Sequence, residues 1–294
     1  MYRNQTFSGI YPAIITPFSK DGTSICWESL ERLLKYQVKS KVDGVVVCGS
    51  TGEAQTLSDQ EFYNIIESVL KFKSKDFKVI AGVGSNDTKK ACQLARWCKE
   101  SGTDAILLVT PFYNKPTQAG LVAHVDQVKQ QADIPIIAYN VPGRTGVNLL
   151  PQTVAKMVEM NLIVGIKEAS GSMDQILDII SLVGDKVAVL AGDESLLCCT
   201  LVSGGHGGIS ATGNLIPELL VSIMNAAKDN DWETARKVQL EALPLIRACF
   251  METNPIPLKA AMNLKGIIQH DTLRLPLTSP QEVTRERFRT LLDL

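Results

Sequence analysis

Histidine and paired cysteines are scarce in this sequence of 294 residues. The three histidines are far apart and lie in no H-E-x-x-H pattern, so a metal site built on histidine has little support. No C-x-x-C pair is present, and several of the seven cysteines lie within apolar segments. The histidines are His124, His206 and His270, and the cysteines are Cys26, Cys48, Cys92, Cys98, Cys198, Cys199 and Cys249. These absences predict no metal, no disulfide framework and a reducing compartment.

Neither an excess of one charge nor a long hydrophobic run is present. The 30 basic residues nearly balance the 31 acidic residues, which leaves a formal charge of -1. Without a basic stripe, nucleic acid and anionic membrane are poor partners. No segment approaches the roughly 18 apolar residues of a membrane span, and residues 1–6 lack the apolar run of a secretion signal. We therefore expect a cytoplasmic protein.

The chain does have a regular succession of short, β-branched apolar runs separated by segments of helical period. The predicted strands are residues 10–16, 44–48, 79–82, 105–110, 136–140, 163–167, 187–191 and 208–210. Helical segments lie between them, for example at residues 27–38, 59–72, 88–99 and 117–131. Eight βα units in succession predict an α/β fold, the (β/α)8 TIM barrel. A doubly wound open sheet is the alternative.

The strand rhythm stops near residue 214, and three helical segments follow at residues 217–228, 232–250 and 256–264. We expect a barrel catalytic domain over residues 1–224 and a small C-terminal helical domain over residues 225–294. Helix-start residues support the assignment of the helices. Ser58, Asp87 and Pro151 each stand where a predicted helix begins.

Lys167 ends the apolar run Ile163–Ile166, which is typical of a buried parallel strand. An ammonium group at this position either reaches water or loses its proton, and a neutral amine can condense with a ketone to form an iminium. Taken alone, the position also fits a lysine that extends from a strand end into solvent. Because the carboxyl ends of barrel strands line the catalytic mouth, the other strand ends decide between the two interpretations.

Two strand ends carry hydroxyl and guanidinium groups. The turn Gly49–Glu53 offers Ser50, Thr51 and free backbone N–H groups, which can hold a small carboxylate or cap the next helix. Tyr139 ends the fifth strand, and the turn that follows contains Arg144. This places a proton donor and a bidentate ligand for carboxylates at one mouth.

The remaining strand ends are less specific. Tyr113 follows the fourth strand and fits either a surface or a subunit contact, and Gly192-Asp193-Glu194 follows the seventh. Glycines at 204–208 can approach a phosphate, but Gly82-Val83-Gly84 lacks the third glycine of a dinucleotide fingerprint, and no Walker pattern is present. A lysine amine, a phenol, hydroxyls and one arginine instead favour imine chemistry on a keto acid.

Seven segments, taken in order, resemble the dihydrodipicolinate synthase family over nearly the whole chain. They are Gly49–Glu53, Thr110–Pro116, Tyr139–Gly146, Gly165–Ala169, Gly204–Gly207, Asn254–Lys259 and Thr272–Pro276. The resemblance implies a lyase that condenses pyruvate with L-aspartate 4-semialdehyde to 4-hydroxy-tetrahydrodipicolinate, in diaminopimelate and lysine biosynthesis. It implies no cofactor and no metal, only a covalent Schiff base between lysine and pyruvate.

The resemblance also implies four catalytic residues. Lys167 forms the Schiff base, and Tyr139 is the general acid and base. Ser50 takes the relay position where family members commonly have threonine, and Tyr113 resembles the relay tyrosine that is donated to a neighbouring subunit's site. A shared site of this kind implies a homotetramer built from tight dimers.

Substrate binding is implied for four further residues. Thr51 and Ile209, with the backbone near Gly192, contact pyruvate. Arg144 guards the entrance and binds the carboxylate of the semialdehyde.

The sequence departs from the family at three positions. Ser50 keeps the hydroxyl but lacks the methyl group that restricts the threonine rotamer, so we expect a looser relay that still works. Where feedback-regulated relatives bind lysine, this chain has Phe112 instead of tyrosine and Lys90 instead of glutamate. Because a cationic Lys90 repels the ammonium group of the effector, we expect weak or absent inhibition by lysine.

The main alternative is another pyruvate-dependent aldolase of the same superfamily, such as N-acetylneuraminate lyase. That enzyme shares the Gly-Ser-Thr-Gly-Glu turn and the Tyr and Lys pair, whereas Arg144 and the segment Asn254–Pro257 resemble the synthase. A non-catalytic keto-acid sensor is a second alternative, and a nucleotide- or flavin-dependent barrel oxidoreductase is a third. The sequence leaves open whether the released product is hydroxylated or dehydrated.

Overall fold

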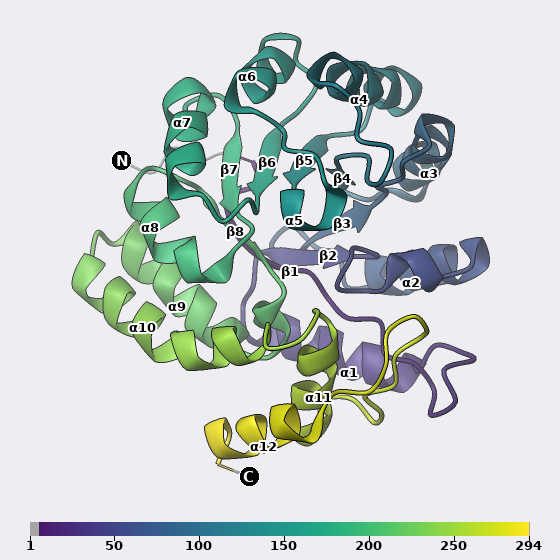
Figure 1. The fold of residues 1–294 in the computed structure, drawn as a ribbon, viewed down its shortest axis with the longest axis vertical. Coiled ribbons are helices and arrows are strands. Elements are labelled where there is room, and N and C mark those ends of the chain that lie inside the picture. The colour runs from purple at the N-terminus through teal and green to yellow at the C-terminus, as the bar shows by residue number, and fades with distance from the viewer. Residues whose placement is uncertain (1–5, 294) are drawn as a thin grey trace.

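The computed structural model describes residues 6–293. Residues 1–5 and 294 lie outside this range. The prediction that residues 1–6 are not a secretion signal therefore falls mostly outside the described residues. Eight parallel strands form one sheet in the order β1-β8-β7-β6-β5-β4-β3-β2 (Figure 1). The strands are β1 (Gly9–Pro12), β2 (Gly44–Val47), β3 (Lys78–Gly82), β4 (Ala105–Val109), β5 (Ile136–Asn140), β6 (Gly165–Glu168), β7 (Ala188–Ala191) and β8 (Gly207–Ser210).

The sheet closes into a barrel because β1 and β2, which stand at opposite ends of this strand order, also contact each other. A parallel bridge joins Ala13 and Val46, and the Ile14 N–H donates to the Val46 carbonyl at 2.9 Å. A second hydrogen bond joins the same two strands near the start of β2, where the Asp43 N–H donates to the Ile10 carbonyl at 3.0 Å. The predicted (β/α)8 barrel is therefore confirmed, and the open-sheet alternative is wrong.

Helices surround the barrel, as Figure 1 shows. They are α1 (Trp27–Lys39), α2 (Asp59–Leu70), α3 (Thr88–Ser101), α4 (Gln118–Ala132), α6 (Pro151–Glu159), α7 (Met173–Val183) and α8 (Leu197–Val202). The short helix α5 (Pro142–Thr145) instead lies over the strands in this view. Ser58 begins α2 in a capping box with Glu61, and the Asp87 carboxylate accepts from the Lys89 N–H at the start of α3. These helix starts, and Pro151 in the first turn of α6, confirm the signals seen in the sequence.

Apolar side chains fill both faces of the sheet, as expected for buried parallel strands. One buried cluster lies inside the barrel and includes Tyr11, Val46, Ile80, Leu107, Ile137 and Leu190. A larger cluster lies between the strands and the helices. Because side chains alternate along a strand, the residues that point inward at the carboxyl ends of the strands face a common mouth.

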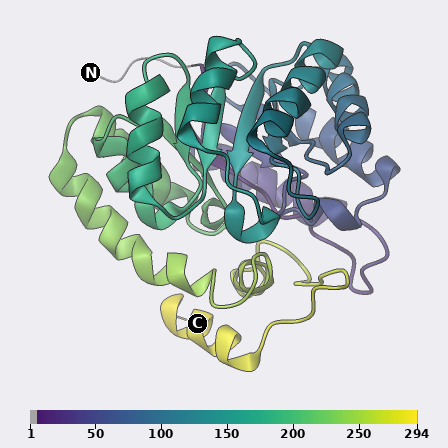
Figure 2. The same ribbon diagram turned by 45° about the horizontal axis from the view of Figure 1, so that its top comes forward.

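The C-terminal part of the chain is helical and packs beside the barrel. Its helices are α9 (Pro217–Lys228), α10 (Trp232–Ala248), α11 (Ile256–Leu264) and α12 (Glu282–Leu291). In Figure 2 the yellow C-terminal segment lies below the barrel, on the side where the short teal helix α5 projects. The predicted boundary after residue 224 falls inside α9, which contacts both β1 and α10, and it stays a prediction. Within residues 6–293, no helix has the length and apolarity needed to cross a membrane.

Candidate active site

A cavity of about 190 Å³ lies at the carboxyl ends of the barrel strands. Six of the eight residues expected in the site line it, and they come from four strand ends and the short helix α5. They are Ser50, Thr51, Tyr139, Arg144, Lys167 and Gly192. The structure therefore brings together groups that are up to 142 positions apart in the chain, from Ser50 to Gly192.

Lys167 lines this cavity and is buried, with 6% of its surface exposed. Burial lowers the pKa of Lys167 to about 8, because the apolar surroundings disfavour the charged form. The Glu194 carboxylate opposes this shift, and the Arg144 guanidinium adds to it. At pH 7 roughly a tenth of the molecules then carry a neutral amine here, against roughly one in several thousand at the ordinary pKa of lysine. The solvent-exposed interpretation of Lys167 is wrong.

Tyr139 is the neighbour of Lys167 across the sheet. The two residues are register partners in the β5–β6 ladder, and the Lys167 Nζ lies 4.3 Å from the centre of the Tyr139 ring. Burial raises the pKa of Tyr139 to about 12, and the Arg144 charge partly offsets this effect. The phenol is therefore protonated at neutral pH and is available as a proton donor beside the amine.

Hydrogen bonds fix the backbone of the turn that carries Ser50 and Thr51. The Gly52 N–H donates to the Gly49 carbonyl at 3.0 Å, and the Thr16 hydroxyl donates to the Gly52 carbonyl at 2.7 Å. Thr51 is buried, whereas Ser50 is half-buried at the cavity wall. The turn thus presents two hydroxyls to the cavity from a fixed backbone.

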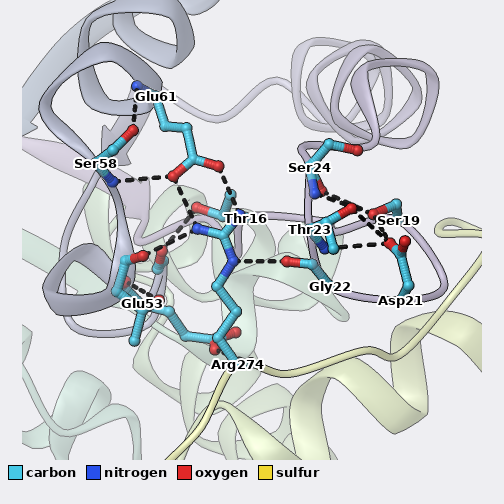
Figure 3. Close-up of polar contacts among 12 residues, drawn as sticks. Thr16, Ser19, Asp21, Gly22, Thr23, Ser24, Glu53, Ser58, Glu61 and Arg274 are labelled. Atoms are coloured by element: carbon cyan, nitrogen blue, oxygen red, sulfur yellow. Dashed lines mark hydrogen bonds and ion pairs between the residues drawn. The ribbon is translucent and has the colours of Figure 1, made fainter.

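Glu53 anchors the end of this turn from a left-handed backbone conformation with φ of 53°. Its carboxylate forms a fully buried ion pair with Lys259, with 2.5 Å between Oε1 and Nζ. Its other oxygen accepts from the Arg274 backbone N–H at 3.0 Å. The Arg274 guanidinium in turn binds both oxygens of Glu61 and donates to the Gly22 carbonyl, as Figure 3 shows. The C-terminal segment is therefore fastened to the turn that carries the two hydroxyls.

Asn254 is a functional candidate that the sequence did not single out. Its Nδ2 donates to the Thr51 hydroxyl at 2.9 Å, and its carbonyl accepts from an Arg144 guanidinium nitrogen at 3.0 Å. Asn254 also lines the cavity. It lies in the C-terminal part of the chain, outside the barrel strands, so the rule that catalytic residues follow strands could not identify it. Its only signal was its place in a segment that resembles the family.

Gly192 forms part of the cavity wall where β7 ends. Its N–H donates to the Glu168 carbonyl at 2.7 Å, and a Cβ atom at this position would lie 2.6 Å from the Ala169 Cβ. Only glycine therefore lets the backbone after β7 pass so close to the end of β6.

Tyr113 and Ile209 are the two expected residues that do not line the cavity. Ile209 is fully buried in the cluster inside the barrel that also contains Tyr139. Tyr113 has 88% of its surface exposed and a left-handed backbone with φ of 74°, and its N–H donates to the Thr145 carbonyl. Within one chain, Tyr113 is thus held outward at the surface, away from the buried amine.

The described part of the chain contains no cluster of side chains suited to bind a metal ion. Among residues 6–293, histidine, cysteine, aspartate and glutamate nowhere gather in a group of three or more that could hold an ion.

Comparison with known proteins places this geometry in a family. A model of the dihydrodipicolinate synthetase family matches residues 6–294. The chain belongs to this family. It is 45% identical over 286 residues to the 4-hydroxy-tetrahydrodipicolinate synthase of Thermodesulfovibrio yellowstonii, with 97% of each chain covered.

Solved structures of the family agree with this assignment. The dihydrodipicolinate synthase of Thermotoga maritima superposes with a TM-score of 0.95 at 39% identity, over 98% of each chain. The structure of the enzyme from Cyanidioschyzon merolae with lysine bound gives a TM-score of 0.95 at 33% identity, over 99% of this chain and 98% of that one.

Proposed function

We propose that this family member condenses pyruvate with L-aspartate 4-semialdehyde to form 4-hydroxy-tetrahydrodipicolinate. The observation that carries the proposal is the buried amine of Lys167 beside the protonated phenol of Tyr139, in one cavity. Relatives that cover nearly the whole chain are named for this activity. The apolar surroundings of Lys167 supply what the reaction needs first, a neutral lysine amine within reach of a small ketone.

In the first step the Lys167 Nζ adds to the carbonyl carbon of pyruvate. The resulting hydroxyl leaves as water, and a protonated imine remains. Both events need a proton delivered to oxygen, and Tyr139 is the donor, since its raised pKa keeps the phenol protonated. Ser50 relays protons to Tyr139 from the cavity wall, and Tyr113 of a neighbouring subunit extends the relay.

In the second step the iminium makes the methyl group of pyruvate acidic. Loss of one proton gives an enamine, whose terminal carbon attacks the aldehyde carbon of the second substrate. The aldehyde oxygen takes up a proton through Tyr139 and becomes the hydroxyl of the product. The ammonium group of the semialdehyde then loses a proton, and the resulting amine adds to the former carbonyl carbon and displaces Lys167, so that the ring closes. Overall, one water and one proton are released.

Carboxylate recognition is divided between the two ends of the cavity. The Thr51 hydroxyl and the backbone near Gly192 bind the carboxylate of pyruvate. Arg144 binds the carboxylate of the semialdehyde at the entrance, where Asn254 fixes its guanidinium. The reaction needs no cofactor, because the lysine imine is itself the electron sink.

We further propose a homotetramer of tight dimers that resides in the cytoplasm. The exposed Tyr113 supports the tight dimer, because a relay tyrosine held at the surface can act only in another subunit's site. Sedimentation that showed a fully active monomer would remove Tyr113 from the mechanism.

Borohydride trapping tests the proposed function. Reduction in the presence of pyruvate should add the mass of the reduced pyruvate adduct to the peptide that contains Lys167. Lys259 is a matched internal control, because burial also lowers its pKa to about 8 but it is paired with Glu53. An adduct on Lys259, or none, would contradict the assignment. In paired assays, aspartate 4-semialdehyde should be consumed and N-acetylmannosamine should not.

A further inference from the structure

Glu194 holds a carboxylate in the cavity wall that the proposed mechanism does not use. The residue follows β7, and 3% of its surface is exposed. Its Oε1 atom accepts from the Ser210 hydroxyl at 2.9 Å, from the Thr212 N–H at 3.0 Å and from the Ala211 N–H. Three donors on one oxygen fix the position of the side chain.

The second oxygen of Glu194 has no hydrogen-bond partner within the described residues. The residue lines the same cavity as Lys167 and Arg144. A carboxylate oxygen that is buried without a partner is costly, and in a residue that lines a cavity it indicates a ligand that completes it.

Other carboxylates around the mouth already have partners. Glu168 accepts from Asn140, Gln175 and the Ser170 N–H, and Glu53 pairs with Lys259. Asp193 accepts from the N–H and the hydroxyl of the residue two positions further on. Among the described residues that line this cavity, Glu194 is thus the one with a buried carboxylate oxygen left unpaired.

We propose that Glu194 binds the α-ammonium group of the aldehyde substrate. This inference rests on the proposed function, because aspartate 4-semialdehyde carries an ammonium and a carboxylate on the same carbon. Arg144 supplies the cation for the carboxylate, and the unpaired oxygen of Glu194 supplies the anion for the ammonium in the same cavity. Binding at this oxygen also keeps the nitrogen inside the cavity with Lys167, where it must attack, once it has lost a proton, to close the ring.

Glu194 therefore acts as a specificity residue for amino aldehydes. Succinic semialdehyde is the matched probe, since it has the same chain, aldehyde and carboxylate but lacks the amino group. The protein to use is the enzyme with its pyruvate adduct reduced on Lys167, because no turnover can follow when an aldehyde binds. Failure to form this adduct would count against the proposed function, before any statement about Glu194 is tested.

Calorimetry then compares the two aldehydes. We expect the wild-type adduct to bind aspartate 4-semialdehyde about ten- to hundredfold more tightly than succinic semialdehyde, as for a hydrogen bond between charged groups. Glu194→Gln keeps the acceptor at Oε1 and removes the charge, so it should abolish this preference and change the binding of succinic semialdehyde less than about twofold. Ser210→Ala, which removes one donor to Oε1 but leaves the charge, should keep the preference.

Two results would overturn the inference. An equal loss of affinity for both aldehydes in Glu194→Gln would assign Glu194 a structural role only. Equal binding of both aldehydes by the wild-type adduct would also overturn the inference. This comparison needs no variant, so the inference remains testable even if Glu194→Gln does not fold.

Discussion

Tyr139 and Lys167 are partners on one rung of the barrel, and the lysine Nζ lies 4.3 Å from the centre of the tyrosine ring. Burial acts on the two groups in opposite directions, because it disfavours the charged form of each. It lowers the pKa of Lys167 to about 8 and raises that of Tyr139 to about 12. Between these values the amine is mostly neutral while the phenol keeps its proton, which is the combination that imine formation requires.

The first prediction concerns the pH dependence of adduct formation. Below its pKa Lys167 is mostly protonated and cannot attack a carbonyl, so the rate of adduct formation should rise about tenfold per pH unit and level off above about pH 8. Quenched-flow trapping with borohydride at a series of pH values measures this rate. Arg144→Leu removes a cation that lowers the pKa of Lys167, so its profile should move to higher pH. A rate that did not change with pH would contradict the assignment of the buried amine as the nucleophile.

The second prediction concerns the relay hydroxyl of Ser50. Ser50→Ala removes the hydroxyl from the cavity wall and should lower kcat about a hundredfold, the usual contribution of a positioned proton-transfer group. Ser50→Thr restores the hydroxyl with a more restricted rotamer and should match or exceed the wild-type kcat. Steady-state assays of the three proteins decide the matter. Wild-type activity in the alanine variant would remove residue 50 from the relay.

The third prediction concerns the buried ion pair of Glu53 and Lys259. Glu53→Gln leaves the Lys259 ammonium buried without its counter-charge, which should lower the free energy of unfolding by about 3–5 kcal/mol. Glu282→Gln is a matched control, because it breaks an exposed pair with Arg289 and should cost at most about 1 kcal/mol. Denaturant unfolding monitored by circular dichroism measures both changes. Similar losses in the two variants would show that the buried pair contributes no more than a surface pair.

Strand periodicity and strand ends predicted the barrel and most of its mouth. Lys167, Tyr139 and Ser50 could be found because each lies within a few positions of the end of a short apolar run, and such runs recur through the chain. Helix α12 could not be predicted from the sequence. Its only buried residues among those described are Thr284 and Phe288, which are too few to give a recognisable apolar face.

No role could be assigned to Asn254 or to Glu194 from the sequence, for a different reason. The role of each depends on a contact made across the fold, 203 positions away for Asn254 with Thr51 and 16 for Glu194 with Ser210. Local sequence patterns carry no information about which oxygen such contacts leave unpaired. Residues that position or complete a site through long-range contacts therefore emerge only from the structure.

The last prediction concerns regulation by lysine, at the positions where feedback-regulated relatives bind this effector. Lys90 lies exposed on α3, with its Nζ 3.7 Å from Asp59, and Phe112 offers no hydroxyl. A lysine ligand brings its own ammonium groups, and a cationic Lys90 repels them. Because both charges are exposed, dissolved salt screens this repulsion. Half-inhibition should therefore require more than millimolar lysine, and the double variant Lys90→Glu, Phe112→Tyr should be inhibited at lower concentrations. Inhibition assays of both proteins at equal ionic strength test this. Half-inhibition of the wild-type enzyme by submillimolar lysine would show that the effector binds without the glutamate and the tyrosine hydroxyl.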